Sequence, residues 1–236
     1  QIIEKGNVDY LVCDYLSEVT MSILSGAKLK SSEYGYAKDF INHVGPLLKT
    51  IKQNKIKVIS NAGGVNLDAC KKALSNKAKK ENINLKIITV EGDDLSGIQK
   101  DLQKMSIKEI DSGKPLPENL LSINAYLGAP GIKRALDQGA DIVITGRCVD
   151  SALALGPLMY EFNWKENEYD LLASGSLAGH IIECGAQSTG GNFTDWEIID
   201  NFEDIGFPIV EVEENGQFIV TKPKGTGGVV NFGTVA

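Results

Sequence analysis

The sequence predicts an α/β fold, in which a mostly parallel sheet with flanking helices is joined to a smaller C-terminal α+β part with a hairpin. Two observations support this fold class. Short apolar runs alternate with helical patterns over most of the chain, which implies right-handed crossovers and a parallel sheet. The pattern changes near residue 170, so we expect an α/β domain over residues 1–170 and the smaller part over residues 171–236.

The strands of the sheet are predicted from short runs that are apolar on both faces, as strands buried between two helical layers tend to be. These runs cover residues 10–14, 57–60, 86–91, 122–126 and 141–145.

The helices are predicted from apolar residues that recur at a spacing of three to four. The first pattern covers residues 36–53, although Gly45 and Pro46 should kink or split it, because proline cannot donate a helical hydrogen bond. A second helix with a polar outer face is expected over residues 67–80. Shorter helices are expected over residues 131–138 and 151–162, and a surface loop over residues 104–119.

The C-terminal part begins with small residues at 173–185 and a glycine-rich stretch at 188–192. Two strands follow, over residues 210–213 and 217–221. The Asn215-Gly216 pair between them is a strong hairpin signal, because both residue types tolerate a positive φ.

Charge and cysteine usage exclude several classes of protein. The net charge of -7 leaves no basic patch for nucleic acid. The four cysteines are far apart without a C-x-x-C pair, which argues against a zinc knuckle or a disulfide scaffold and for a reducing, cytoplasmic location. No apolar run approaches the roughly 20 residues that span a membrane, and the start lacks a signal-peptide pattern. Since the chain does not begin with Met, we expect it to be a segment of a longer protein.

A first candidate ligand loop follows the predicted strand at residues 57–60. Open α/β sheets bind ligands beyond the carboxyl ends of their strands. Here Asn61 precedes Gly63 and Gly64, whose backbone amides could face a carboxylate or phosphate at the start of the next helix. The alternative is a tight turn that needs glycine for its backbone angles alone.

A second candidate loop, Gly146-Arg147 with Asp150, follows the strand at residues 141–145. An arginine just past a buried strand usually meets a carboxylate, a phosphate or a carbonyl group. Asp150 is either its partner in a structural ion pair or the cap of the following helix. In the second case Arg147 is free to contact a substrate or cofactor.

A third loop places Glu91, Asp93 and Asp94 at one strand end. Neighbouring carboxylates can raise one another's pKa and so create a proton carrier, or hold a cation such as Mg²⁺. Asp94 is equally an ordinary helix cap. Because spacing identifies no further ligand, we assign no metal site and keep a divalent cation as the less favoured alternative. Asn124 and Tyr126, at another expected strand end, offer an amide and a phenol that are suited to orienting a carbonyl group, and equally to satisfying backbone groups in the turn.

His180 and Glu183 form the remaining pair, since residues three apart share one face of a helix. A carboxylate beside an imidazole fixes its orientation and favours its charged form, which prepares a general acid or base. The alternative is a histidine that is merely satisfied in the core or caps a helix. Cys148 and Cys184 lack an adjacent base and are expected to act as small buried hydrophobes.

Several blocks in order resemble the acyclic terpene utilisation AtuA family. The match runs from near residue 9 to Gly228. Its blocks are Asp14-Tyr15-Leu16-Ser17-Glu18-Val19-Thr20-Met21, Ser60-Asn61-Ala62-Gly63-Gly64-Val65-Asn66, Gly92-Asp93-Asp94, Thr145-Gly146-Arg147 with Asp150, Ala178-Gly179-His180 with Glu183-Cys184-Gly185-Ala186-Gln187, and Ile205-Gly206-Phe207-Pro208.

The resemblance implies a role near acyl-CoA or carboxylic-acid metabolism. Members of this family occur with bacterial pathways that activate branched terpenoid acids as coenzyme A thioesters and then carboxylate, hydrate and cleave them. They usually have a further strand and glycine-rich turn ahead of Gln1, continue past Ala236, and often carry proline where Leu67 stands.

Together these features predict an enzyme of the lyase or hydratase type that acts on a carboxylate or acyl-CoA. Arg147 would hold the acid or thioester carbonyl, and the amides of Gly63 and Gly64 would stabilise negative charge. His180, oriented by Glu183, would move the proton, and Asp93 or Asp94 would serve as a second proton carrier.

The competing interpretation is a non-catalytic binding or assembly subunit of an acyl-CoA carboxylase-like complex. In either case we expect a homo-oligomer or a subunit of a larger assembly. A nicotinamide enzyme is disfavoured, because no G-x-G-x-x-G with a later acidic residue occurs in the chain. No cofactor is assigned beyond a coenzyme A thioester as substrate.

Overall fold

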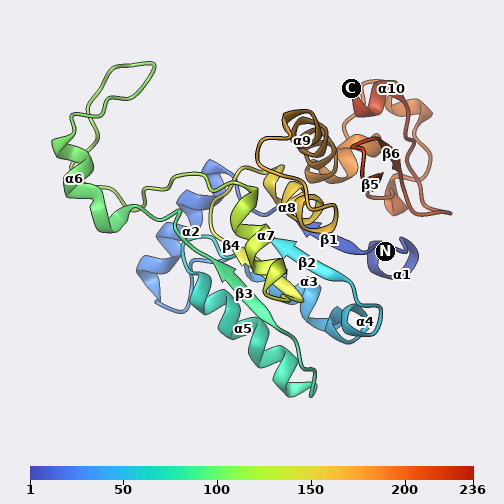
Figure 1. Cartoon of the computed structure of the whole chain (residues 1–236), viewed down its shortest axis with the longest axis horizontal. Helices are drawn as coiled ribbons and strands as arrows, with labels where there is room; N and C mark the ends of the chain where they lie inside the picture. Colours follow the sequence, from blue (N-terminus) through green and yellow to red (C-terminus); the bar gives the residue numbers. More distant parts are fainter.

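The computed structural model describes all residues, 1–236, and confirms the α/β fold with a C-terminal hairpin. A four-stranded parallel sheet, in the order β1-β2-β4-β3, lies between helices (Figure 1). Its strands are β1 (Tyr10–Cys13), β2 (Lys57–Ser60), β3 (Ile87–Val90) and β4 (Ile142–Thr145).

Side chains of the two central strands alternate between two separate cores. Val58 and Ile142 pack in one core with Phe40. Ile59 and Val143, which pair across the sheet, pack in the other. This alternation explains why both strands are apolar at successive positions, since each face of the sheet is covered by helices.

Helices of the N-terminal half form the first layer, and the predicted split at Gly45 and Pro46 is confirmed. The elements are α1 (Ile2–Lys5), α2 (Glu18–Lys30), α3 (Lys38–Val44), η1 (Gly45–Leu47), α4 (Leu48–Gln53) and α5 (Leu67–Lys80). Helix α5 has the predicted bounds. Helix α2 was not predicted; Ser17 caps it by accepting a hydrogen bond from the Thr20 amide at 3.3 Å.

The second helical layer consists of α7 (Ala129–Asp137) and α8 (Ala152–Glu161), which pack against each other and on the opposite core. Both correspond to predicted helices. Helix α9 (Tyr169–Glu183) packs on α8 and carries the small residues predicted at the start of the C-terminal part.

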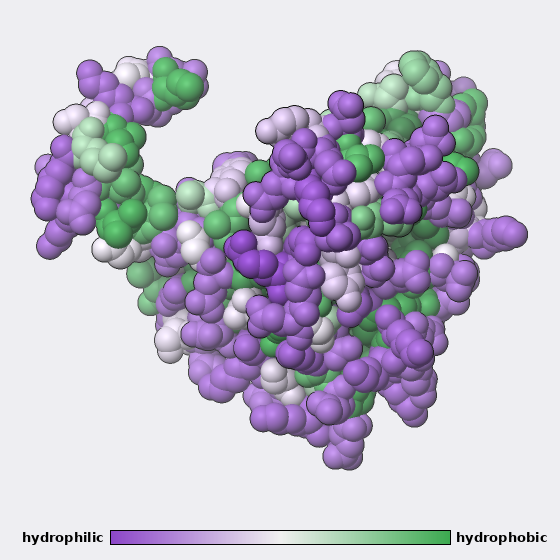
Figure 2. All heavy atoms as spheres, in the orientation of Figure 1, coloured by the Kyte–Doolittle hydropathy of each residue, from purple (hydrophilic) through white to green (hydrophobic).

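The strand predicted at residues 122–126 is wrong. This segment makes only one isolated bridge, from Asn124 to Asp94, and a second bridge joins Leu127, just after it, to Cys148. The reason is that the chain leaves the sheet after β3 and forms a protruding arm with η2 (Ser96–Ile98) and α6 (Gln99–Lys104) (Figure 1). The arm carries exposed apolar side chains, of which Ile110 is 95% exposed, and stands apart from the body (Figure 2). The surface loop at residues 104–119 is confirmed.

The C-terminal hairpin pairs β5 (Ile209–Val212) with β6 (Phe218–Thr221) in antiparallel register, as predicted. Within the turn at residues 214–216, only Gly216 has a positive φ, at 85°. The Asn215 side chain accepts a hydrogen bond from the Gln217 amide. The turn is therefore a longer one closed by a left-handed glycine, not a two-residue turn. The short elements around it are η3 (Gly185–Thr189), η4 (Trp196–Ile198), η5 (Phe202–Asp204) and α10 (Phe232–Val235).

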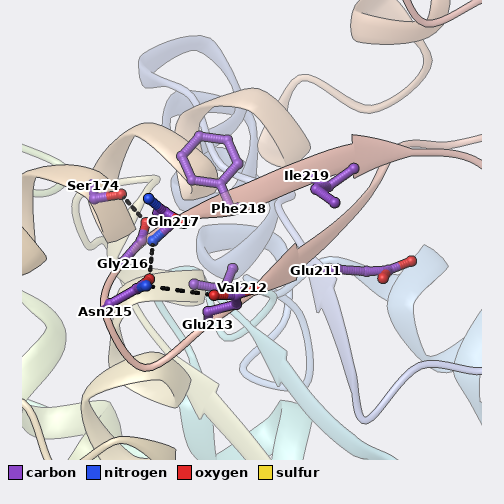
Figure 3. A pocket seen from close by; sticks show the side chains of 9 residues that line it. All are labelled: Ser174, Glu211, Val212, Glu213, Asn215, Gly216, Gln217, Phe218 and Ile219. Carbon is purple, nitrogen blue, oxygen red and sulfur yellow. Dashed lines mark hydrogen bonds between the residues drawn. The ribbon is translucent and has the colours of Figure 1, made fainter.

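An open groove of ≈ 800 Å³ runs along this hairpin (Figure 3). Ser174 of α9 lines it and donates a hydrogen bond to the Gly216 carbonyl, which ties the hairpin to the helix. None of the predicted site residues lines this groove. No helix of the protein is both long enough and apolar enough to cross a membrane.

Candidate functional site

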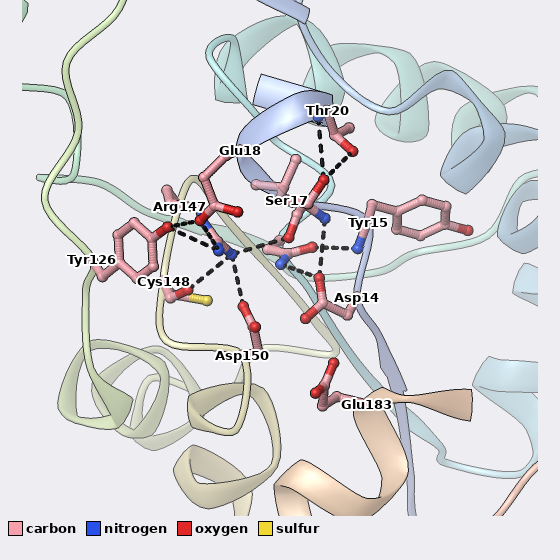
Figure 4. Close-up of polar contacts among 12 residues, drawn as sticks. Asp14, Tyr15, Ser17, Glu18, Thr20, Tyr126, Arg147, Cys148, Asp150 and Glu183 are labelled. Atoms are coloured by element: carbon pink, nitrogen blue, oxygen red, sulfur yellow. Dashed lines mark hydrogen bonds and ion pairs between the residues drawn. The ribbon is translucent and has the colours of Figure 1, made fainter. Parts of the chain in front are cut away.

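The candidate site lies beyond the carboxyl ends of the parallel strands (Figure 4). Asp14 follows β1 and Asn61 follows β2, while Arg147 and Asp150 follow β4. Helix α9 ends at Glu183 beside them. This is the edge of an open α/β sheet at which ligands usually bind.

Arg147 is at the centre of the site and is only 4% exposed. Its Nη1 donates hydrogen bonds to Asp150 Oδ1 at 2.7 Å and to the Leu16 carbonyl at 3.0 Å. Asp150 is therefore its ion-pair partner, which was one of the two predicted roles. The alternative, in which Asp150 caps the following helix, does not hold, because no side chain caps α8.

The second nitrogen of Arg147 faces Glu18, which was not predicted, and Tyr126, whose phenol the sequence offered for orienting a carbonyl group. Nη2 donates to Glu18 Oε1 at 3.2 Å and to the Tyr126 hydroxyl at 3.1 Å. The Tyr126 ring also packs on the guanidinium, with 4.2 Å between Cζ and the ring centroid, which is a cation–π contact. Burial acts to lower the pKa of Arg147, but the hydrogen bonds with Tyr126 and Asp150 outweigh it, so the net pKa is raised and the charge is fixed.

Asp93 supports the turn that carries Arg147. It is 2% exposed, and its Oδ2 accepts hydrogen bonds from the Arg147 amide at 2.8 Å and from Asn124 Nδ2 at 2.9 Å. Burial raises the pKa of Asp93, while these hydrogen bonds oppose the shift. Gly146 is required here, because a Cβ would lie 2.4 Å from Asp93 Oδ1.

Asp94 Oδ1 accepts a hydrogen bond from the Ser96 amide at 2.8 Å. Glu91 accepts one from Thr89. The three carboxylates of this turn do not gather as one group of metal ligands. The charge of Asp94 adds to the raised pKa of Asp93, as expected of neighbouring carboxylates, and the role of either aspartate as a second proton carrier stays a prediction.

The glycine turn after β2 is closed by its own hydrogen bonds. The Gly63 amide donates to the Thr145 carbonyl at 3.1 Å and the Gly64 amide to the Asn61 carbonyl at 3.2 Å. A Cβ on Gly63 would lie 2.6 Å from the Thr145 oxygen, and Gly64 has a φ of 55°. The expectation of free amides facing an anion is thus wrong, and the alternative of a turn that needs glycine for its backbone holds.

Asn61 is fully buried and orders the chain after β1. Its Oδ1 accepts a hydrogen bond from the Tyr15 amide at 2.8 Å, and its Nδ2 donates to Asp14 Oδ1 at 2.6 Å. The Leu16 amide donates to the same Asp14 oxygen at 3.0 Å. The other oxygen of Asp14, Oδ2, is buried without any hydrogen-bond partner.

Three carboxylates from distant segments meet beside this oxygen. One oxygen each of Asp14, Asp150 and Glu183 lies within 4.8 Å of the others. Burial raises the pKa of Asp14, and the charges of Asp150 and Glu183 raise it further against two opposing hydrogen bonds. Such a group can share a proton, or hold a hard cation through its oxygens.

His180 lies at the outer side of this cluster. Its Nδ1 is 3.3 Å from Glu183 Oε1, and its side chain is 71% exposed, so it is not a core histidine. The Cys184 thiol donates to the same Glu183 oxygen, and burial raises the pKa of Cys184 to about 11, so it remains a thiol at neutral pH. Glu183 thus connects an exposed imidazole to the half-buried carboxylates, and Asp150 connects these to Arg147.

Sequence reasoning did not name Asp14 or Glu18 as site residues, and it considered Tyr126 only as a phenol at an expected strand end. Asp14 had a usable signal, since it is the last residue of a predicted strand and Asn61 directly follows another. Glu18 had none, because α2 was not predicted.

Comparison with known proteins gives one match. A family model described as acyclic terpene utilisation family protein AtuA matches residues 1–236, the whole chain. No curated protein and no solved structure matches.

Proposed function

Because the chain belongs to the acyclic terpene utilisation family AtuA, we propose that it is an acid–base enzyme in the breakdown of branched, terpenoid carboxylic acids. Its substrate is the acid or its coenzyme A thioester, and its reaction is of the lyase or hydratase type. The observation that carries the proposal is the meeting of Asp14, Asp150 and Glu183 at the strand ends, with His180 at their exposed side.

Chemistry of this type needs one group to remove a proton and another to deliver one near an acid or thioester carbonyl. His180 is the exposed member of the cluster, so its Nε2 is available to a substrate that arrives from solvent. Glu183 holds Nδ1 and balances the charge of the imidazolium when His180 takes up a proton.

Asp14 provides the second proton position. Its raised pKa favours the protonated acid, and its unpartnered Oδ2 lies in the cluster of carboxylates. In the hydration direction, His180 takes a proton from water as the oxygen bonds to the β-carbon, and a proton from the cluster goes to the α-carbon. Arg147 contributes by holding Asp150 in place through an ion pair, with 2.7 Å between Nη1 and Oδ1.

The test is turnover of a panel of branched α,β-unsaturated acids and their coenzyme A thioesters, followed by mass spectrometry. We expect wild-type protein to convert at least one member and the His180→Asn and Glu183→Gln proteins to lose about 10²- to 10⁴-fold in kcat. Asp170→Asn is the matched control, because Asp170 is exposed in the first turn of the same helix. Parallel reactions with Mg²⁺ and with a chelator show whether the carboxylates work with a proton or with a cation.

Two results would contradict the proposal. Folded His180→Asn and Glu183→Gln proteins that react like wild type would remove the cluster from the chemistry. Wild-type protein that binds the thioesters unchanged, or that purifies only with a partner, would favour the non-catalytic binding or assembly subunit instead.

A further inference from the structure

The two sides of the Arg147 guanidinium differ in their exposure to solvent. Asp150 holds Nη1 on the side of the carboxylate cluster, and Glu18 and Tyr126 meet Nη2 on the other side (Figure 4). The Glu18 side chain is 77% exposed although the Arg147 side chain is only 5% exposed. The exposed carboxylate of Glu18 is therefore paired with the buried guanidinium of Arg147.

Two donors converge on a single oxygen of Glu18. Arg147 Nη2 donates to Oε1 at 3.2 Å, and the Tyr126 hydroxyl donates to the same atom. The hydroxyl in turn accepts from Nη2 at 3.1 Å, and the ring stacks on the guanidinium, so the two donors are held in fixed relation. A planar guanidinium next to an oriented hydroxyl is well suited to bind a carboxylate.

Glu18 is the more exposed of the two carboxylates that pair with Arg147. An ion pair with an exposed partner adds little to stability, because water solvates the free carboxylate nearly as well. Asp150, by contrast, is half-buried and also belongs to the carboxylate cluster. Exchange of Glu18 for another carboxylate would leave the charge balance around Arg147 unchanged.

We propose that Arg147 Nη2 and the Tyr126 hydroxyl form a carboxylate-binding site, and that Glu18 occupies it as an internal substitute which the carboxylate of a ligand displaces. Glu18 Oε1 marks the position of an oxygen of that ligand. This inference rests on the proposed function and names the part of the substrate that the protein recognises, a free carboxylate.

The ionisation of Glu18 fits this role. The hydrogen bond from Tyr126, together with that from Arg147, lowers the pKa of Glu18 to about 2. Glu18 is therefore an anion at any pH at which a ligand carboxylate is one, and the two compete as like charges. The proposed carboxylate site is also close to the carboxylate cluster. Arg147 Nη2 would bind the ligand carboxylate, while Nη1 binds Asp150 of the cluster.

Binding of a simple probe tests the proposal without any turnover. The probe is 3-methylbutanoate, a branched carboxylate, and its comparator is the uncharged isostere 3-methylbutanamide, both followed by titration calorimetry or ligand-detected NMR. We expect the carboxylate to bind and the amide to bind at least 10-fold more weakly. The Glu18→Gln and Glu18→Ala proteins should bind the carboxylate about 3- to 10-fold more tightly, and Tyr126→Phe about 5- to 10-fold more weakly.

Glu33→Gln is the matched control, because Glu33 is also exposed and pairs with Lys72 away from Arg147. It should leave binding unchanged. Equal binding of acid and amide, or unchanged or weaker acid binding by both Glu18 variants, would overturn the inference. His180→Asn should retain binding even where turnover is lost, so failure of the proton-transfer proposal and failure of this site are told apart.

Discussion

Replacement of Asp14 with asparagine tests whether the carboxylate cluster is costly to the fold, as a functional site often is. Asp14 Oδ2 is buried without a partner, close to the oxygens of Asp150 and Glu183. Asparagine keeps the oxygen that accepts from Asn61 and Leu16. Its amide group replaces the unpartnered oxygen and can donate to a neighbouring carboxylate.

The expected change in the free energy of unfolding follows from the replacement of that one oxygen by an amide group. A new hydrogen bond contributes about 0.5–1.5 kcal/mol net, and more when its acceptor is charged. We therefore expect Asp14→Asn to raise the free energy of unfolding by about 1 kcal/mol at pH 7. For a chain of this length, 1 kcal/mol corresponds to a Tm about 2–4 °C higher. Turnover should fall in the same protein, because the proton position is lost.

The effect should also depend on pH in a defined direction. The folded protein raises the pKa of Asp14, so the folded state binds this proton more tightly than the unfolded chain. The contribution to stability is then complete below the ordinary aspartate pKa of about 3.9 and is lost as the pH rises through the folded-state value. The advantage of Asp14→Asn over wild type should therefore shrink as the pH is lowered from 7 towards 4.

Scanning calorimetry of both proteins between pH 4 and pH 7 measures this difference. Asp9→Asn is the control, since Asp9 is exposed at the amino end of β1 and should give no comparable change. A destabilised Asp14→Asn protein at pH 7, or a difference that grows on acidification, would refute the reasoning.

Three further substitutions test other parts of the site and fold. Gly146→Ala should lower the free energy of unfolding by about 2–4 kcal/mol in urea titrations, because its Cβ would lie 2.4 Å from Asp93 Oδ1, whereas Gly97→Ala, with open space around it, should change it little. Ser17→Ala removes the cap of α2 and should cost about 1 kcal/mol, with Ser22→Ala on the same helix as the neutral control. Trp164→Phe loses the 2.9 Å hydrogen bond to the Glu214 carbonyl and should cost about 1 kcal/mol, with faster hydrogen exchange in the hairpin; unchanged exchange would contradict this.

The sequence predicted those helices and strands in which each face is consistently buried or consistently exposed. Strands β2 and β4 are apolar at their buried positions except for Ser60 and Thr145 at their carboxyl ends, and α5 has a polar outer face, so all three were predicted. Helix α2 was not, because it exposes Val19 and Ile23 while it buries Met21, and so has no clear apolar face. The false strand at 122–126 has strand-like residues but no neighbouring strand to pair with.

Two contacts of the candidate site were predicted from sequence: Arg147 with Asp150 after a strand, and His180 with Glu183 from helical spacing. The structure shows both contacts and brings them together at the carboxylate cluster. The direction of the Gly63 amide was not predictable, because it depends on the approach of the Thr145 carbonyl from a strand far along the chain. Partners such as Tyr126 depend on the path of the arm, which local sequence does not encode.

The most direct test of the carboxylate cluster is an NMR titration of the Asp14 side-chain carboxyl group in wild-type and Glu183→Gln proteins. The cluster predicts a pKa above the ordinary aspartate value in wild type, due first to burial and then to its charged neighbours, and a fall towards that value when the charge of Glu183 is removed. An ordinary pKa in wild type that the Glu183 substitution leaves unchanged would show that these carboxylates do not act together.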